Sequence, residues 1–185
     1  CSRPEYAFRC AAESTLRCRL HLCGNTFHSM RHDIIGLPAF TVIGLERTGS
    51  VCTAFEWVPG LWAETTRRTN EVRHLSIDGC WGLMSDKDEF LAPWQDQGRY
   101  LAGWQVPRGT EPIGDWQVWN VPTSTWLRIA LRIDQYDQAF AFLHGQFLPA
   151  GPWKQNGAAH EFYPREFQDP KTDELMLCVP LAPKD

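Results

Sequence analysis

The residue types that most readily hold a metal ion gather near the start of the chain. Cys18, Cys23, His28 and His32 supply thiolate and imidazole groups within a short segment. A zinc finger separates its two ligand pairs by a long spacer, whereas Cys23 and His28 stand close together. His32 and Asp33 also form an HD pair, which needs further His and Asp ligands that we cannot place. We therefore predict no metal ion and no other cofactor.

Aromatic residues are the second group that can carry chemistry, because the chain holds nine Trp, ten Phe and four Tyr. The formal net charge is −4, which argues against a direct nucleic-acid-binding surface. Negative charge combined with many rings favours cationic or aromatic ligands instead.

The compartment can be inferred from cysteine usage and from hydropathy. The seven cysteines are an odd number, and those of the body are isolated in apolar stretches. This pattern is atypical of a disulfide framework and favours a reducing cytoplasm. No apolar run approaches the roughly 18 residues that a membrane span requires. The sequence therefore predicts a cytoplasmic protein with no membrane association.

The elements that must position the aromatic residues follow one order twice. In the first half we predict a strand over 39–45, a helix over 61–75 after Pro59 and Gly60, and strands over 81–84 and 100–106. In the second half we predict strands over 116–121 and 126–133, a helix over 136–147, and strands over 159–165 and 175–181. Both halves thus contain the order strand, helix, strand, strand.

This repetition predicts an α+β fold in which two pseudo-repeated halves, 37–110 and 111–183, share an antiparallel sheet with a ligand cleft between them. Residues 1–33 follow no clear period and are rich in Arg and Cys. We interpret residues 1–33 as an atypical N-terminal extension, of which residues 1–29 have little role in the core, and residues 34–185 as the domain.

Four stretches together resemble the GyrI-like effector-binding domain family, over about residues 34–181. They are LPAFTVIG at 37–44, YLAGWQV at 100–106, VPTSTW at 121–126, and HEFY at 160–163 followed by VPL at 179–181. Ser124, Trp126 and Leu181 replace the Gly, Tyr and Val that are usual in the family, and these are mild departures. The resemblance implies a small-molecule-binding domain like the ligand-sensing domains of AraC- and MerR-type multidrug regulators.

Glu161 is the main site residue that the resemblance implies. Family members that sense lipophilic cations place a buried carboxylate of an E-x-Y strand among aromatic rings. Glu161 and Tyr163 fit this motif, and alternate residues of a strand share one face. Tyr163 could therefore cover a ligand or donate a hydrogen bond to the carboxylate. The alternative is that Glu161 lies at the surface of an edge strand, as most glutamates do.

Five tryptophans are candidates for the walls of the same pocket. Tyr100, Ala102 and Trp104 share one strand face, and Trp119 lies on the opposite face of its strand from Trp116. The expected ligand-binding residues are Glu161, Tyr163, Trp104, Trp116, Trp119, Trp81 and Trp62. Each tryptophan could instead belong to the core, which is the commoner place for an aromatic residue in a strand.

Three functions remain open at this point. The first is binding of amphipathic, cationic aromatic molecules by a sensor or sequestering protein that has no chemistry of its own. The second, which the resemblance implies because some family members are hydrolases, is a hydrolase of small reactive electrophiles. Glu161 would be its general base, since a carboxyl group in an apolar cavity has a raised pKa. The third is interaction with a protein partner or formation of a homodimer.

Overall fold

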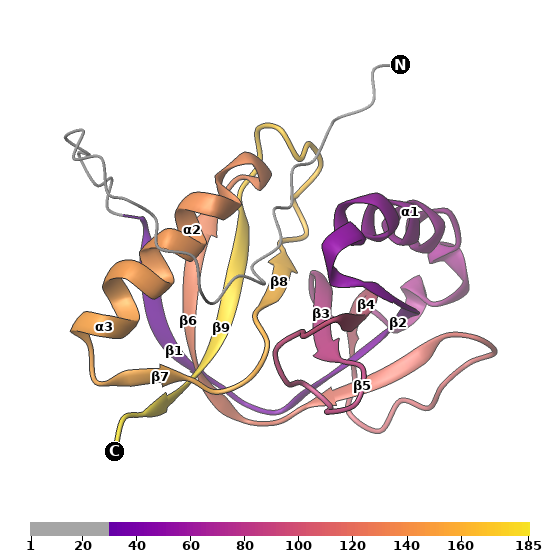
Figure 1. Cartoon of the computed structure of the whole chain (residues 1–185). Coiled ribbons are helices and arrows are strands. Elements are labelled where there is room, and N and C mark those ends of the chain that lie inside the picture. Colours follow the sequence, from indigo (N-terminus) through magenta and orange to yellow (C-terminus); the bar gives the residue numbers. More distant parts are fainter. Residues whose placement is uncertain (1–29) are drawn as a thin grey trace.

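The computed structural model describes residues 30–185 and consists of one nine-stranded antiparallel sheet with helices above one face (Figure 1). The order of the strands is β1-β6-β9-β8-β3-β4-β2-β5, and β7 pairs with the end of β9. The predicted α+β architecture with a shared antiparallel sheet is therefore confirmed. No helix in the described part of the chain is long and apolar enough to cross a membrane.

The first half contains the predicted order of elements. Its strands and helix are β2 (Phe40–Ser50), α1 (Ala54–Arg67), β3 (Cys80–Asp86) and β4 (Gln97–Val106). The second half repeats this order with β6 (Ser124–Leu131), α2 (Tyr136–Phe142), β8 (His160–Tyr163) and β9 (Leu175–Pro183). The halves meet where β3 pairs with β8, through the residue pairs Cys80↔Tyr163, Trp81↔Phe162 and Gly82↔Glu161.

In each half, a strand ahead of the repeated elements pairs with the other half. The strand β1 (His32–Leu37) pairs with β6, and β5 (Gln117–Val121) pairs with β2. This exchange ties the two halves together at both ends of the sheet, in addition to their contact at its centre. The sequence analysis included neither β1 nor the short β7 (Trp153–Gln155).

The first helix begins earlier than predicted and contains Pro59. A proline inside a helix removes one backbone N–H donor, so the prediction placed the start of the helix after Gly60. Four buried residues, Ala54, Val58, Leu61 and Thr65, recur at helical spacing across the proline. The burial of this stripe outweighs the local cost of Pro59. The helix ends at Arg67, and 3-10 turns at Thr69–Glu71 and Arg73–Leu75 replace the rest of the predicted helix.

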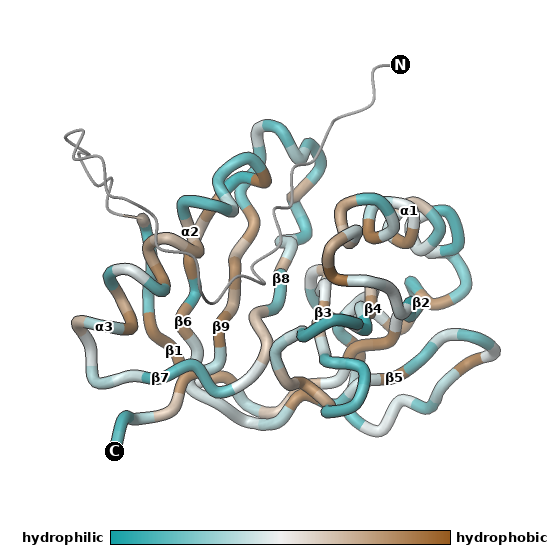
Figure 2. The backbone as a smooth tube through the Cα atoms, viewed as in Figure 1, coloured by the Kyte–Doolittle hydropathy of each residue, from teal (hydrophilic) through white to brown (hydrophobic). Residues whose placement is uncertain are grey.

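Both helices pack on the same face of the sheet, and each covers one half. Helix α1 buries its apolar stripe against β2 and β4, whereas α2 packs on β6 and β9. A π turn (Leu143–Phe147) and the short α3 (Leu148–Ala150) extend α2. Figure 2 shows hydrophobic residues along β6 and β9. A third cluster, which includes Trp81 and Trp119, is buried on the opposite face, so both faces of the sheet are apolar.

Candidate functional site

A cavity of about 700 Å³ opens above the junction of the two halves. Its walls come from α1, from the chain between residues 69 and 80, from Trp104 of β4, and from Tyr136, Glu161 and Tyr163 of the second half. A volume of this size fits a drug-sized ligand. The cavity lies at the junction where the repeated halves predict a ligand cleft.

Glu161 lies at the wall of this cavity with only 2% of its surface exposed. Three tyrosine hydroxyls donate to its carboxylate. Tyr136 donates to Oε1, and Tyr100 and Tyr163 donate to Oε2, with a Tyr163 Oη to Oε2 distance of 2.8 Å. The carboxylate is thus buried and accepts three hydrogen bonds, from residues of β4, α2 and β8.

Burial dominates the electrostatics of this group. It raises the pKa of Glu161 above the usual 4.5, and the three hydroxyl donors oppose that rise only in part. Burial also raises the pKa of each tyrosine well above its usual value, so all three remain neutral donors. Among residues 30–185 no Lys or Arg forms an ion pair with Glu161. The negative charge is therefore left without a counter-charge in the described part of the protein.

The neighbouring histidine does not supply that counter-charge. His160 is buried on the opposite face of β8, and its Nδ1 accepts a hydrogen bond from the backbone N–H of Met84 at 3.0 Å. Burial lowers the pKa of His160 to about 3. The imidazole is therefore neutral at physiological pH.

Aromatic rings surround the carboxylate. The indole Nε1 of Trp62 donates to the hydroxyl of Tyr100 at 2.9 Å, which orients that hydroxyl for its own bond to Glu161. Trp62 and Tyr163 meet edge to face, with ring centroids 5.1 Å apart, and Phe167 packs on Tyr163 at 5.0 Å. The wall next to the carboxylate is thus made of ring faces and edges.

The structure brings together only some of the predicted site residues. Glu161, Tyr163, Trp62 and Trp104 all line the cavity. Of the two roles considered for Tyr163, a hydrogen bond to the carboxylate is the one observed here. Trp116 packs behind Trp104, with ring centroids 6.0 Å apart, and does not reach the cavity.

Trp81 and Trp119 differ from the expectation because they lie on the other face of the sheet. Trp81 pairs across the sheet with Phe162, which is the residue after Glu161, and its ring stacks on Phe40. Trp119 donates from its indole to Glu46 at 2.9 Å. Adjacent residues of a strand point to opposite faces, so neither indole can line a cavity that opens on the helix-covered face.

Tyr100 and Tyr136 are the site residues that sequence reasoning missed. Tyr100 was placed on the same strand face as Trp104, which is a usable signal once Trp104 is expected in the pocket. Tyr136 fits the apolar stripe of its helix and gave no sign of a polar role. Its contact with Glu161 depends on how α2 packs over the sheet.

Gly82 explains why two side chains can converge on one point of the sheet. It pairs with Glu161 across the β3–β8 junction and with Ala102 of β4. A Cβ atom at residue 82 would lie 1.9 Å from the hydroxyl oxygen of Tyr100 and 2.6 Å from Oε2 of Glu161. The missing side chain therefore provides the space in which the phenol meets the carboxylate.

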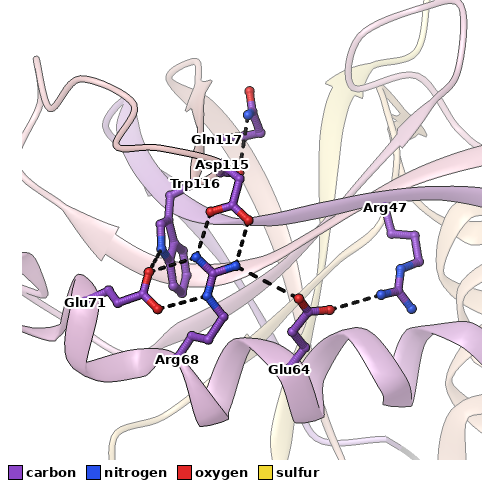
Figure 3. Close-up of polar contacts among 7 residues, drawn as sticks. All are labelled: Arg47, Glu64, Arg68, Glu71, Asp115, Trp116 and Gln117. Atoms are coloured by element: carbon purple, nitrogen blue, oxygen red, sulfur yellow. Dashed lines mark hydrogen bonds and ion pairs between the residues drawn. The ribbon is translucent and has the colours of Figure 1, made fainter.

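A charged cluster fixes the end of α1 near the aromatic wall (Figure 3). Arg68 donates to both oxygens of Asp115, at 2.6 and 2.7 Å, and to both oxygens of Glu71, at 2.9 and 2.8 Å. Glu71 also accepts the indole N–H of Trp116 at 2.8 Å. The cluster joins the end of the helix to Trp116, which packs behind Trp104.

The metal-ligand types noted near the start of the sequence lie on both sides of the first described residue. Cys18, Cys23 and His28 lie outside the described residues. Within residues 30–185 no group of three or more His, Cys, Asp and Glu side chains could hold a metal ion. His32 contacts the carbonyl of Met30 at 2.8 Å, and Asp33 accepts a hydrogen bond from Arg128 at 2.9 Å. In the described chain this pair therefore has structural contacts within and beside β1.

Several solved structures share this fold. A protein described as a bacterial transcription regulation protein from Staphylococcus aureus MU50 aligns with a TM-score of 0.65 and 12% identity, over 83% of this chain and 99% of the other. SAV2435, solved with bound tetraphenylphosphonium, aligns with a TM-score of 0.64 and 13% identity, over 83% and 94%. The C-terminal domain of EcmrR aligns with a TM-score of 0.58 and 12% identity, over 84% and 99%.

No curated protein matches the sequence significantly. The model of the GyrI-like small molecule binding domain matches residues 30–182. This range contains all the strands and helices of the described chain except the last residue of β9. The chain therefore belongs to the GyrI-like small-molecule-binding domain family.

Proposed function

We propose that this protein binds lipophilic aromatic cations in the cavity between its halves, with Glu161 as the counter-charge. The observation that carries the proposal is a carboxylate 2% exposed at a cavity wall, with no cationic partner in the described residues. Its three neutral hydroxyl donors stabilise the negative charge without neutralising it.

The physical argument concerns the cost of burying charge. A carboxylate removed from water is unfavourable unless an opposite charge or hydrogen bonds compensate. An organic cation with delocalised charge is weakly hydrated, so it gives up little on entering an apolar cavity. Trp62, Trp104 and Tyr163 line the cavity, and a cation placed over the face of such a ring is attracted by its quadrupole.

The similarity to SAV2435 supports the same class of ligand, because that protein was solved with tetraphenylphosphonium bound. The similarity to a bacterial transcription regulation protein favours sensing of the ligand as the biological role, with sequestration as the alternative within the same proposal. Neither role requires a chemical change in the ligand.

Two ions of nearly the same shape and opposite charge test this function. We expect tetraphenylphosphonium to quench the tryptophan fluorescence with saturation, because Trp62 and Trp104 line the cavity. Tetraphenylborate, as the sodium salt in potassium-free buffer, should bind at least about thirtyfold more weakly, because its charge repels a buried carboxylate. Equal affinity for the two ions would contradict the proposal.

Recovery of the ligand distinguishes binding from the hydrolase alternative. Tetraphenylphosphonium should be recovered unchanged, and electrophilic test esters should disappear no faster with the protein than in buffer alone, as measured by chromatography of the mixture. Product formation that disappears in Glu161→Gln would instead favour catalysis by this carboxyl group.

Cation binding should also release protons from the protein. The pKa of free Glu161 is raised by burial, so part of the population is protonated at pH values above 4.5. A bound cation stabilises the ionised form and lowers this pKa. Affinity should therefore rise with pH through the pKa of free Glu161 and then level off.

Calorimetry in two buffers of different ionisation enthalpy measures these protons directly, because tetraphenylphosphonium itself has no titratable group. The same linkage predicts that Glu161 favours folding of the free protein most below pH 4.5, and that this contribution is lost as pH rises through the raised pKa. Undiminished proton release in Glu161→Gln would assign the protons to another group.

A further inference from the structure

The mouth of the cavity carries charge of the opposite sign to its interior. Three charged residues line the cavity and are also exposed to solvent, so they lie at its mouth: Arg73, Asp78 and Arg165. Two of the three are cationic. The one charged group buried inside is Glu161.

The two arginines come from different halves and approach the same segment. Arg73 lies in the 3-10 turn Arg73–Leu75, and Arg165 follows β8. The guanidinium of Arg165 donates to the backbone carbonyl of Ile77, which follows the turn that holds Arg73. Across residues 30–185 neither arginine forms an ion pair. The carboxylate of Asp78 is engaged with the N–H of Gly79 at 2.8 Å.

This distribution suits a ligand that carries both signs of charge. A simple cation gains nothing from two guanidinium groups at the mouth, although salt and solvent screen their repulsion. A carboxylate matches the donor geometry of guanidinium and forms charge-assisted hydrogen bonds with it. A molecule with a cationic aromatic end and a carboxylate end would meet complementary charge at both ends of the cavity.

We propose that the preferred ligand class of this site is an aromatic cation that bears a carboxylate on the same molecule, with the carboxylate held by Arg73 and Arg165 at the mouth. This inference rests on the proposed role of Glu161 as counter-charge. The inference adds recognition of the carboxylate end of the ligand to the recognition of its cationic end.

Rhodamine B and its ethyl ester form a matched pair of probes. Both contain the same xanthylium cation, but rhodamine B has a free carboxylate that the ester lacks. We expect wild-type protein to bind rhodamine B about three- to tenfold more tightly at low salt, as measured by fluorescence anisotropy. The added ethyl group favours the ester in an apolar site, so a preference for the acid cannot come from hydrophobicity. High salt should reduce the preference.

The double variant Arg73→Gln/Arg165→Gln should reduce the ratio of affinities to about one, and it should bind the ester no more weakly than the wild-type protein does. Arg67→Gln is the matched control, because Arg67 is exposed on α1 and does not line the cavity. It should keep the wild-type ratio. If the double variant does not fold, the wild-type ratio and its salt dependence still decide the question.

The two proposals fail in different ways. Equal wild-type affinity for the two dyes, with both weakened by Glu161→Gln, would overturn the role of the arginines and leave the counter-charge intact. Unchanged binding of both dyes in Glu161→Gln would overturn the proposed function itself. Weakening of both dyes by Glu161→Gln, together with a ratio that depends on the arginines, is the result that supports both.

Discussion

Glu161→Gln is expected to weaken tetraphenylphosphonium binding by at least about thirtyfold, because it removes one partner of a buried charge pair, worth about 2–5 kcal/mol. Glutamine keeps the size of the side chain and removes only its charge. The hydroxyls of Tyr100, Tyr136 and Tyr163 can still donate to the amide oxygen or accept from the amide nitrogen. Affinity measured by fluorescence titration should therefore change through electrostatics and not through a collapsed site.

The folded state of this variant should be intact. Burial raises the pKa of Glu161, so the ionised carboxylate is a cost to the free protein, and a neutral amide removes that cost. Thermal unfolding of the variant should begin no earlier than that of the parent at neutral pH. Glu166→Gln is the control for charge alone, since Glu166 is exposed and lies outside the cavity wall. Wild-type affinity in Glu161→Gln would refute the counter-charge.

Gly82→Ala is expected to damage both stability and binding. Its Cβ would overlap the hydroxyl of Tyr100, at 1.9 Å, and approach Oε2 of Glu161, at 2.6 Å. Tyr100 is 1% exposed and is held by neighbours on every side, so it has little room to move. Overpacking of this kind costs about 1–3 kcal/mol. We expect a loss of that size in the free energy of unfolding, measured by denaturant titration.

Affinity for tetraphenylphosphonium should fall together with stability, because the hydroxyl of Tyr100 can no longer donate to the carboxylate of Glu161. Gly145→Ala provides the matched control, since a Cβ at residue 145 meets no atom within 4 Å. Gly145 lies in the π turn after α2, where alanine should be neutral or slightly stabilising. A Gly82→Ala protein as stable and as tight-binding as the parent would show that this contact is not close in solution.

The motifs of the strands were the most predictable part of the site. A period of two places Glu161 and Tyr163 on one strand face, and both line the cavity. The same period of two places Tyr100 and Trp104 on one face of β4. Both relations depend only on positions within one strand, so they can be predicted without knowing which strands pair.

The helix boundaries and the end strands were less predictable. Pro59 suggested that the first helix begins after Gly60. The helix instead begins at Ala54, because the burial of the stripe from Ala54 to Thr65 outweighs the cost of the proline. The strand β1 pairs with β6 of the other half, and such long-range pairing leaves no local pattern in the sequence. The division at residue 33 stays a prediction, although β1 begins at His32.

The sequence alone determined the order of the elements and their repetition, and it placed Glu161 and Tyr163 on one face of a strand. Local alternation and turn residues specify these features. Only the tertiary structure decided which tryptophans reach the cavity and which tyrosines hold the carboxylate. Both faces of this sheet are apolar, so hydrophobicity does not reveal which face the helices cover. The convergence of Tyr100, Tyr136 and Glu161 arises from strand pairing and helix packing between residues far apart in the chain.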